Sequence, residues 1–282
     1  MPLVFVPTPL GNLRDITLRA LDVLRDAELI VAEDTRVARK LLAALGIAGR
    51  ELWSYREANA SRATPAIVER ARETLVAVTS DAGMPGISDP GSELIAAARA
   101  AGVAVEVLPG PSAATGVGLL SGFSLRRFTF EGFPPRTQTA RRERFAGALR
   151  NEATTIWYES PQRIRATLTD LAAVAPDAKL FLVREYTKRH EQQLSGTPQK
   201  VIDGLPDPVR GELAFAVAPY AAATAAPTAA EAIEAIDAML KEGRRVGEIA
   251  KLLAAQGFGE RHELYAKTTA RKARRKTSIK ER

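Results

Sequence analysis

The segment SDAGMPGISDPG, residues 80–91, decides the fold of this chain. It follows the apolar run LVAVT, residues 75–79, and contains three glycines, two prolines and two aspartates. Neither a helix nor a strand accommodates that composition, because proline removes a backbone donor and glycine weakens both regular structures. The segment therefore predicts a long, constrained loop at the end of a buried strand.

The first third of the chain alternates between strand-like and helix-like stretches. Continuous Val- and Leu-rich runs, typical of strands buried on both faces, occupy residues 3–6, 28–32, 74–80 and 103–109. Between them, apolar residues recur at helical spacing over residues 15–27, 34–46 and 90–102, and Gly46 and Gly102 stand where C-terminal caps are expected. This alternation predicts a parallel sheet with helices on its faces.

Four further apolar runs, FTFEGF, TTIWYES, KLFLVREY and ELAFAVAP, predict a second sheet, with helices at about 137–150 and at 161–174. Ser160 followed by Pro161 is a favourable helix start. The segment AAATAAPT, residues 221–228, is typical of a linker, and Thr228 with Glu231 forms a capping-box pattern that opens a helical region. We therefore expect an α/β domain over residues 1–118, a second α/β domain over 119–221, and a small helical region over 228–282.

Composition narrows the classes of function. The chain contains no cysteine and only two histidines, His190 and His262, so no metal centre is predicted. The N-terminus has no secretory signal pattern and no apolar run is long enough to span a bilayer, so a cytoplasmic location is expected. Seven Lys or Arg and one Glu lie in residues 270–282, in a chain of net charge +7. This basic tail suggests a polyanion such as RNA, although a solvated terminus is the simpler interpretation of charge alone.

Three loops that contain Gly and Pro, called the three glycine-rich loops below, follow predicted strands. They are PTPLGNLRDIT at 7–17 (the first loop), SDAGMPGISDPG at 80–91 (the acidic loop) and PGPSAAT at 109–115 (the third loop). Ligands of open parallel sheets bind at the carboxyl ends of the strands, and glycine permits close approach of the backbone. The Walker phosphate motif is absent, and GVGLLSG (116–122) does not match the dinucleotide fingerprint. Asp81 suits a ligand with cationic or hydroxyl groups, such as S-adenosylmethionine, whereas Asp89 is expected to cap a helix.

The chain resembles the tetrapyrrole methylase superfamily, and within it the branch of bacterial enzymes that methylate small-subunit ribosomal RNA. The matching stretches, in order, are VPTPLGNLRDIT, AEDTR, SDAGMPGISDPG, VLPGPSA, FEGFPPR, YESPQR, REYTKRHEQ and RGELAFAV. They extend over most of the chain. The sequence departs from the branch at Gln162, where histidine is usual, and at Arg136, where lysine is typical.

The resemblance implies two α/β domains with S-adenosyl-L-methionine bound in the cleft between them. The positions that it assigns to this donor are Leu10, Gly11, Asn12, Asp81, Ala82, Gly83, Pro85, Ile87, Ser112, Ala113 and Tyr158. It also implies methylation of the ribose 2′-hydroxyl of a cytidine in small-subunit (16S) ribosomal RNA, free or in the assembled subunit, by a homodimer.

Methylating a hydroxyl benefits from a base near the acceptor oxygen. The candidate carboxylates are Asp34, Glu159 and Glu185, together with Glu33, and a salt bridge between domains is the alternative role for each. The candidate cations for RNA phosphates are Arg36, Arg136, Lys188, Arg271, Lys272, Arg274, Arg275 and Lys276.

Two other functions stay open at this point. One is a methyltransferase of the same superfamily that acts on a tetrapyrrole or another acceptor, although PTPLGN stands where tetrapyrrole enzymes tend to carry G-x-G-P-G-D. The other is a non-catalytic RNA-binding assembly factor that uses residues 243–267, which are predicted to form a helix, a glycine turn and a helix. The three glycine-rich loops argue against the second alternative, because a pure RNA binder has no use for them.

Overall fold

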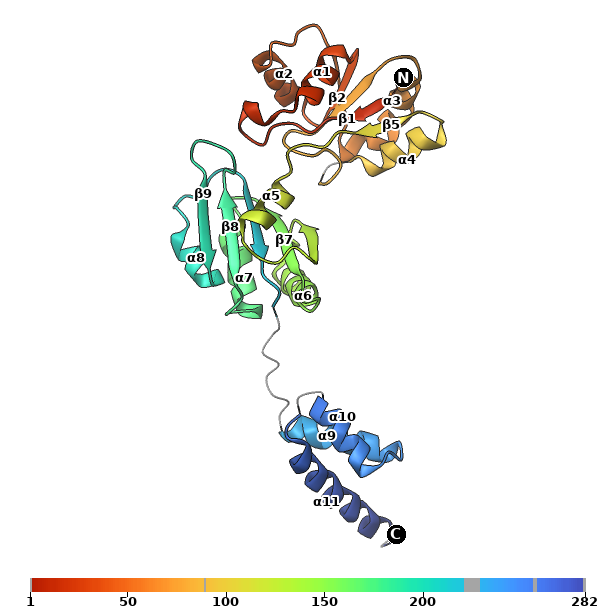
Figure 1. Cartoon of the computed structure of the whole chain (residues 1–282), viewed down its shortest axis with the longest axis vertical. Coiled ribbons are helices and arrows are strands. Elements are labelled where there is room, and N and C mark those ends of the chain that lie inside the picture. Colours follow the sequence, from red (N-terminus) through yellow and green to blue (C-terminus); the bar gives the residue numbers. More distant parts are fainter. Residues whose placement is uncertain (1, 89, 221–228, 256–257, 281–282) are drawn as a thin grey trace. The chain divides into compact units, whose positions relative to one another are not determined.

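The computed structural model describes residues 2–88, 90–220, 229–255 and 258–280. The chain divides into two compact units, an N-terminal unit of residues 1–220 and a C-terminal unit of residues 221–282. The N-terminal unit contains two five-stranded sheets (Figure 1). The expectation of α/β architecture with a helical C-terminal region is confirmed.

The first sheet is entirely parallel, with strand order β3-β2-β4-β1-β5. Its strands are β1 (Leu3–Phe5), β2 (Leu29–Ala32), β3 (Glu51–Ser54), β4 (Val76–Thr79) and β5 (Val105–Val107). Its helices are α1 (Leu18–Asp26), α2 (Thr35–Ala44), α3 (Ala60–Glu73) and α4 (Ser92–Ala100), with short 3-10 turns η1 (Leu13–Asp15) and η2 (Glu57–Asn59). Neither β3 nor α3 was predicted from the sequence.

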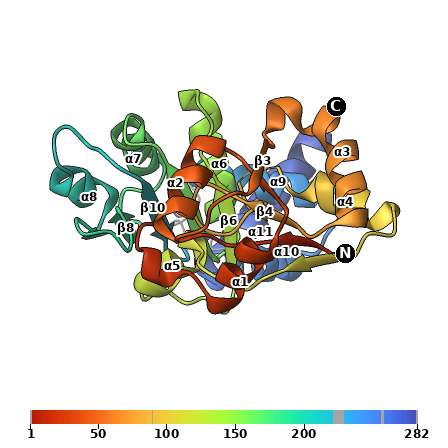
Figure 2. The ribbon, with the colours of Figure 1, turned by 90° about the horizontal axis from the view of Figure 1, so that it is seen from above.

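The apolar runs are continuous because both faces of this sheet are covered by helices (Figure 2). Within β1, Leu3 and Phe5 pack in one core with side chains of α3 and α4, whereas Val4 packs in another with side chains of α1 and α2. Successive residues of a strand point to opposite faces, so every position must be apolar. The parallel sheet predicted from the sequence is therefore confirmed.

The second sheet is mixed, with strand order β6-β7-β10-β8-β9. Its strands are β6 (Phe128–Gly132), β7 (Thr154–Glu159), β8 (Leu180–Arg184), β9 (Gln192–Gly196) and β10 (Leu213–Val217). Only the β6–β7 pair is parallel; the other three pairs are antiparallel. The edge strand β9 was not predicted, because QQLSG has little apolar character.

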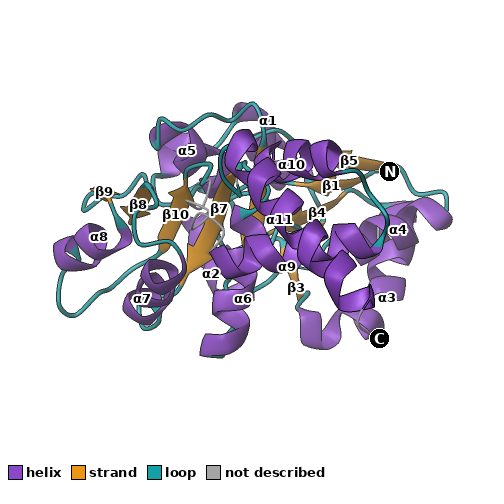
Figure 3. Cartoon of the chain, turned by 90° about the horizontal axis from the view of Figure 1, so that it is seen from below, coloured by secondary structure: helices purple, strands orange, loops and turns teal. Residues whose placement is uncertain are grey.

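Helices cover both faces of the second sheet (Figure 3). Side chains of α6 (Gln138–Leu149), α7 (Ile164–Val174) and α8 (Pro198–Gly204) share one core with the sheet, around the buried Trp157 and Phe215. Helix α5 (Ala113–Leu120) packs against β7 and β10 on the opposite face. Because α5 directly follows the third glycine-rich loop, that loop connects the first sheet to the second.

The C-terminal unit contains α9 (Ala229–Lys241), α10 (Val246–Ala255) and α11 (Arg261–Lys280) around a small core that includes Ile236, Ile249 and Leu264. The solvated tail considered above is therefore helical as far as Lys280. Arg271 of α11 pairs with Asp237 of α9, with Nε donating to Oδ1 over 3.0 Å.

The prediction that α7 begins at Ser160–Pro161 is wrong, because α7 begins at Ile164 and the Ser160 hydroxyl donates to Glu159 Oε1 instead of capping the helix. Several expectations lie outside the described residues: the cap at Asp89, the linker 221–228, the capping box of Thr228 and Glu231, and the side chains of Arg274, Arg275 and Lys276.

Candidate functional site

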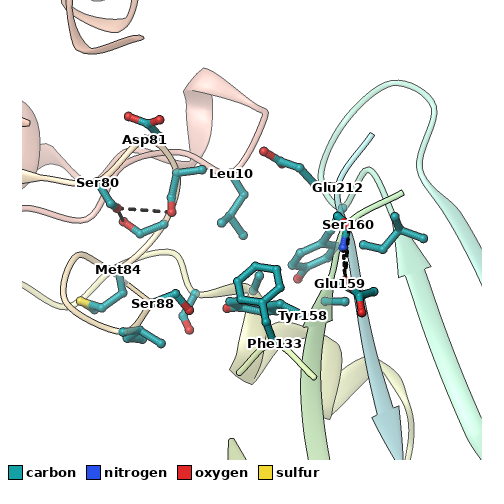
Figure 4. Close-up of a pocket in the computed structure, with 18 of the residues that line it drawn as sticks. Leu10, Ser80, Asp81, Met84, Ser88, Phe133, Tyr158, Glu159, Ser160 and Glu212 are labelled. Atoms are coloured by element: carbon teal, nitrogen blue, oxygen red, sulfur yellow. Dashed lines mark hydrogen bonds between the residues drawn. The ribbon is translucent and has the colours of Figure 1, made fainter. Parts of the chain in front are cut away.

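A cavity of about 480 Å³ lies in the N-terminal unit (Figure 4). One part of its lining comes from the loops of the first sheet: Leu10, Glu33, Ser80, Asp81, Ala82, Gly83, Met84, Ile87, Ser88, Ser112 and Ala113. The other part comes from the second sheet and its connections: Phe133, Tyr158, Glu159, Ser160, Pro161, Val183, Tyr186, Gly211, Glu212, Leu213 and Ala214. Both sheets therefore contribute to one site.

The three glycine-rich loops meet because the strands that they follow, β4, β1 and β5, are neighbours in the first sheet. The first two loops are joined by a pair of backbone hydrogen bonds between Thr8 and Gly83, of 2.9 and 3.0 Å. The Ser80 hydroxyl also donates to the carbonyl of Gly83 over 3.1 Å. These bonds hold the acidic loop against the loop that begins at Pro7.

Gly83 shows why the acidic loop requires glycine. Its φ angle is +79°, in the left-handed region that side chains disfavour. A Cβ atom there would lie 2.9 Å from Cδ2 of Leu10, which also lines the cavity. Any larger residue would therefore strain the backbone and push into the wall formed by the first loop.

The second-sheet wall is aromatic. The Tyr158 ring packs edge-to-face against Phe130 and Phe133, with ring centroids 4.9 and 5.8 Å apart. Tyr186 lies against α5 so closely that a Cβ on Gly116 would be 2.6 Å from its ring. Partial burial raises the pKa of the Tyr186 hydroxyl, so this side chain is neutral at physiological pH.

Asp81 belongs to the acidic loop and is one of the residues that line the cavity. Burial raises the pKa of Asp81, and the nearby carboxylates of Asp34 and Glu212 raise it further. The backbone N–H of Asp34 donates to Asp81 Oδ1 over 3.1 Å and partly offsets this shift. A carboxylate in such surroundings gains from a cationic or hydroxyl-bearing partner.

Eight of the eleven positions expected to bind the donor line the cavity: Leu10, Asp81, Ala82, Gly83, Ile87, Ser112, Ala113 and Tyr158. The other three lie beside it. Gly11 packs against the Lys188 side chain, the Asn12 side chain accepts from Arg14 N and caps η1, and Pro85 is buried within the acidic loop.

The candidate carboxylates are engaged with protein partners. Asp34 caps α2 and binds the Arg36 guanidinium, whose hydrogen bonds hold the pKa of Asp34 far below its usual value. Glu185 would have its pKa raised by burial, but hydrogen bonds from Glu212 N and Lys188 Nζ, each 2.9 Å, outweigh that effect and lower it.

Glu159 lines the cavity, but its side chain is fully buried by protein partners. Its carboxylate accepts from Ser160 N over 2.8 Å and from the Thr167 hydroxyl over 2.7 Å, and Arg163 Nη2 lies 3.1 Å away. This arrangement is typical of a carboxylate that holds neighbouring side chains in place. Glu33, a further candidate, also lines the cavity.

The candidate RNA-binding cations are dispersed. Arg36 and Arg136 are exposed, and Arg36 is paired with Asp34. Lys188 bridges Glu185 and Glu212 at 2.9 Å each, so two carboxylates already neutralise it. Arg271 is paired with Asp237, and Lys272 is exposed on α11.

Several lining residues were not singled out from the sequence. Ser80, Met84 and Ser88 belong to the acidic loop, whereas Gly211–Ala214 lie in RGELAFAV and Phe133 lies in FEGFPPR. The signal was therefore present in the quoted motifs. No cluster of metal-ligating side chains occurs among the residues that the structure describes, and none of the described helices has the length and apolar character to cross a bilayer.

Comparison with known proteins places this geometry in a family. The profile of the Tetrapyrrole (Corrin/Porphyrin) Methylases matches residues 2–201. A Thermotoga maritima protein named ribosomal RNA small subunit methyltransferase I is 42% identical over 202 residues, which are 71% of this chain and 90% of the relative. The protein of the same name from Neisseria meningitidis serogroup B is 42% identical over 221 residues, 77% of this chain and 76% of the relative. The one from Streptococcus pyogenes serotype M1 is 35% identical over 267 residues, 93% of each chain.

Two solved structures share the fold. Diphthine synthase aligns with a TM-score of 0.63 at 18% identity, over 77% of this chain and 90% of its own. A cobalamin biosynthetic enzyme, cobalt precorrin-4 methyltransferase, aligns with a TM-score of 0.59 at 16% identity, over 77% of this chain and 94% of its own. At these identities the likeness concerns the fold alone.

The family match confirms the sequence-based expectations of an enzyme, of methyl transfer and of S-adenosylmethionine as the donor. The chain belongs to the tetrapyrrole methylase family and, within it, to the group of the ribosomal RNA small subunit methyltransferase I proteins.

Proposed function

We propose that this protein methylates small-subunit (16S) ribosomal RNA on the ribose 2′-hydroxyl of a cytidine, with S-adenosylmethionine held in the cavity. The observation that carries the proposal is the joint lining of one cavity by the three first-sheet loops and the second-sheet strand ends, in a chain of this family. The names of the relatives support ribosomal RNA as the substrate. The cytidine and the ribose oxygen are our inference.

The cavity residues fit such a donor. Asp81, with its crowded carboxylate, would accept from the ammonium or the ribose hydroxyls, and Gly83 allows the backbone to approach closely. Bound S-adenosylmethionine would supply an electrophilic methyl carbon on its sulfonium. The acceptor oxygen would form a bond to this carbon as the S–C bond breaks, the hydroxyl proton would pass to a base or to water, and S-adenosylhomocysteine would leave as the neutral thioether. Positioning of that oxygen is the main contribution that we assign to the protein.

The mapping of ribose methylation tests the proposal. In cells lacking the gene, one 2′-O-methyl group should be absent from a cytidine of small-subunit RNA, and purified protein with the donor should restore it. Methylation of a base, or of a tetrapyrrole in place of RNA, would contradict the proposal. Binding of RNA without any transfer would favour the non-catalytic assembly factor.

A substitution of Asp81 tests the donor site. Asp81→Asn should weaken the Kd for S-adenosylmethionine about tenfold or more, because a hydrogen bond to a charged group contributes about 1.5–3 kcal/mol. The affinity of the native protein should also fall as the pH drops through the raised pKa of Asp81, and the Asn variant should lack that dependence. Titration calorimetry at several pH values measures both effects.

Thermal unfolding of the same variant provides the control. A carboxyl whose pKa is raised by folding stabilises the protein when protonated, and that contribution is lost as the pH rises through the folded pKa. Asp81→Asn should therefore leave the Tm at neutral pH unchanged or higher, whereas Asp26→Asn, at an exposed position of α1, should change neither Tm nor Kd. An unchanged donor Kd in Asp81→Asn would remove Asp81 from the site.

Asp34, Glu159 and Glu185 remain our candidates for the base, with Glu33 beside them. The lowered pKa of Asp34 and of Glu185 makes both carboxylates weak bases at neutral pH. We therefore expect proton removal by these carboxylates to contribute less to the rate than the positioning of the acceptor oxygen does. Replacing each carboxylate by its amide and measuring kcat beside the donor Kd separates a base from a structural carboxylate.

We propose that the helical C-terminal unit helps to bind RNA through its basic residues Arg271, Lys272, Arg274, Arg275 and Lys276, and that Arg36, Arg136 and Lys188 of the N-terminal unit contribute as well. Replacing Arg274, Arg275 and Lys276 by Gln should flatten the logarithmic salt dependence of RNA affinity by up to about 0.9 per lost phosphate contact. Equal salt slopes for the native and substituted proteins would exclude these contacts.

We also propose that the protein is a cytoplasmic homodimer whose chain has domains at 1–118, 119–221 and 228–282. Sedimentation of the purified protein tests the dimer.

A further inference from the structure

The loop between β6 and α6 presents an aromatic ring to the cavity. Phe133 lines the cavity, yet its side chain is 54% exposed. Figure 4 shows its ring beside that of Tyr158, on the side of the cavity formed by the second sheet. Arg136, three residues further on, is also exposed. The loop therefore offers a flat apolar face at the cavity and an exposed cation three residues away.

Two arginines hold the backbone of this loop. Arg163 Nη2 lies 2.6 Å from the carbonyl oxygen of Pro134 and 3.1 Å from that of Pro135. Arg141 Nη1 donates to the carbonyls of Pro135 and Arg136, over 3.2 and 3.0 Å. Three consecutive carbonyls are thus bound by guanidinium groups, and two prolines stiffen the same segment.

Each arginine is in turn fixed by a buried carboxylate. Glu159 lies 3.1 Å from Arg163, and Asp170 accepts from Arg141 Nε over 2.8 Å. Both carboxylates are almost fully excluded from solvent. The loop is therefore anchored through two carboxylate–guanidinium pairs, one between α6 and α7 and the other between the end of β7 and the residue before α7, and the exposed Phe133 ring follows this anchored backbone.

A single exposed apolar side chain needs no explanation by itself. Phe133 differs because its ring borders the cavity of a methyltransferase, and the backbone of the three residues that follow it is anchored by four hydrogen bonds. Single-stranded RNA is recognised by stacking of unpaired bases on aromatic rings, and arginine is well suited to its phosphates.

We propose that Phe133 is the platform on which the base of the acceptor nucleotide stacks, with Arg136 at a neighbouring phosphate and with Arg163 and Arg141 as positioning residues. The proposal rests on the proposed function and adds to it the residues that select an unpaired nucleotide. Stacking on Phe133 leaves the first-sheet loops and Tyr158 to the donor. The acceptor ribose would thereby be directed towards the cavity.

The test compares Phe133→Ala with Phe133→Tyr. Base–aromatic stacking contributes about 1–3 kcal/mol per base, so Phe133→Ala should raise KM for unmethylated small subunits about tenfold, while the Kd for S-adenosylmethionine changes less than twofold. Phe133→Tyr should restore the native KM because it keeps the ring. Phe128→Ala is the matched control, since Phe128 is 43% exposed in β6 but does not line the cavity.

Arg163→Lys tests the positioning role. Lysine keeps the charge next to Glu159 but lacks the planar donor geometry that reaches two carbonyls, so KM for the subunit should rise with little change in donor Kd.

Two results with Phe133→Ala would overturn the proposal. A loss of S-adenosylmethionine affinity that parallels the rise in KM would assign the ring to the donor, and an unchanged KM would exclude the platform.

A binding measurement separates this proposal from the proposed function. Fluorescence anisotropy of a labelled single-stranded RNA should show about tenfold weaker binding by Phe133→Ala than by the native protein and Phe128→Ala. Failure of the proposed function would appear in the native protein as an absence of methyl transfer. Failure of the platform would appear as equal RNA affinities of the native and Phe133→Ala proteins while the native protein still transfers the methyl group.

Discussion

Replacing Asp170 by alanine is expected to lower the free energy of unfolding of the N-terminal unit by about 3–5 kcal/mol, because the substitution leaves a buried cation without its partner. The Asp170 side chain is 1% exposed and that of Arg141 is 8% exposed. Asp170 also accepts from Arg142 Nε over 2.8 Å and from Gln138 Nε2 over 3.1 Å. Urea unfolding measures the loss as a shift in the midpoint at constant slope.

The stabilisation that Asp170 contributes should change with pH in one direction. Burial by itself would raise the pKa of Asp170, but the hydrogen bonds from Arg142, Arg141 and Gln138 outweigh it and lower the pKa. The stabilisation is therefore present above the unfolded value of about 4 and is lost as the pH falls towards the folded pKa. The difference in stability between the native protein and Asp170→Ala should accordingly narrow in acid.

Asp177→Ala is the matched control for Asp170, because Asp177 is exposed in the turn after α7. Its effect should stay within about 0.5 kcal/mol, as for other surface substitutions. If Asp170→Ala were no less stable than this control, the carboxylate–guanidinium cluster would not stabilise the second sheet.

Replacing Gly110 by alanine is expected to abolish measurable donor binding and to destabilise the N-terminal unit by about 1–3 kcal/mol, the usual cost of overpacking. A Cβ at Gly110 would lie 2.7 Å from Cβ and 3.0 Å from Cγ of Pro7. Pro7 begins the first glycine-rich loop and is buried, and its ring cannot rotate away. The first and third loops would have to separate, which distorts the cavity between them.

Gly147→Ala is the control that separates the steric effect at Gly110 from the general effect of replacing a glycine by alanine. Gly147 lies within α6, and the nearest atom to a Cβ there is 3.7 Å away. Alanine should therefore stabilise α6 by about 0.5–1 kcal/mol and leave donor binding intact. Calorimetry and thermal unfolding of both variants suffice, and undiminished donor affinity in Gly110→Ala would contradict the close packing of the two loops.

Local sequence determined four of the five strands of the first sheet and the three loops. Runs such as LVFV and LVAVT are apolar at every position because both faces of β1 and β4 are covered, and that pattern is visible without a structure. The loops were equally visible, since few conformations are open to SDAGMPGISDPG. The family resemblance then supplied the donor positions, most of which line the cavity.

Edge strands and the first residue of a helix were harder to predict. The strands β3 and β9 lie at the edges of their sheets and lack a continuous apolar pattern, so neither was recognised. The start of α7 was misplaced because the Ser160 hydroxyl found a partner in Glu159, which the local sequence could not favour over a helix cap.

The roles of the charged residues were decided only by the tertiary structure. A carboxylate in YESPQR or AEDTR has the same sequence signature whether it takes up a proton or holds an arginine. Glu159 meets Arg163 and Thr167 within eight residues of chain, but Asp170 meets Arg141 across 29 residues, and the cavity itself requires strand ends of two different sheets. Hydrophobic pattern and turn composition are local properties of a chain, whereas the pairing and burial of charges depend on which segments the folded backbone brings together.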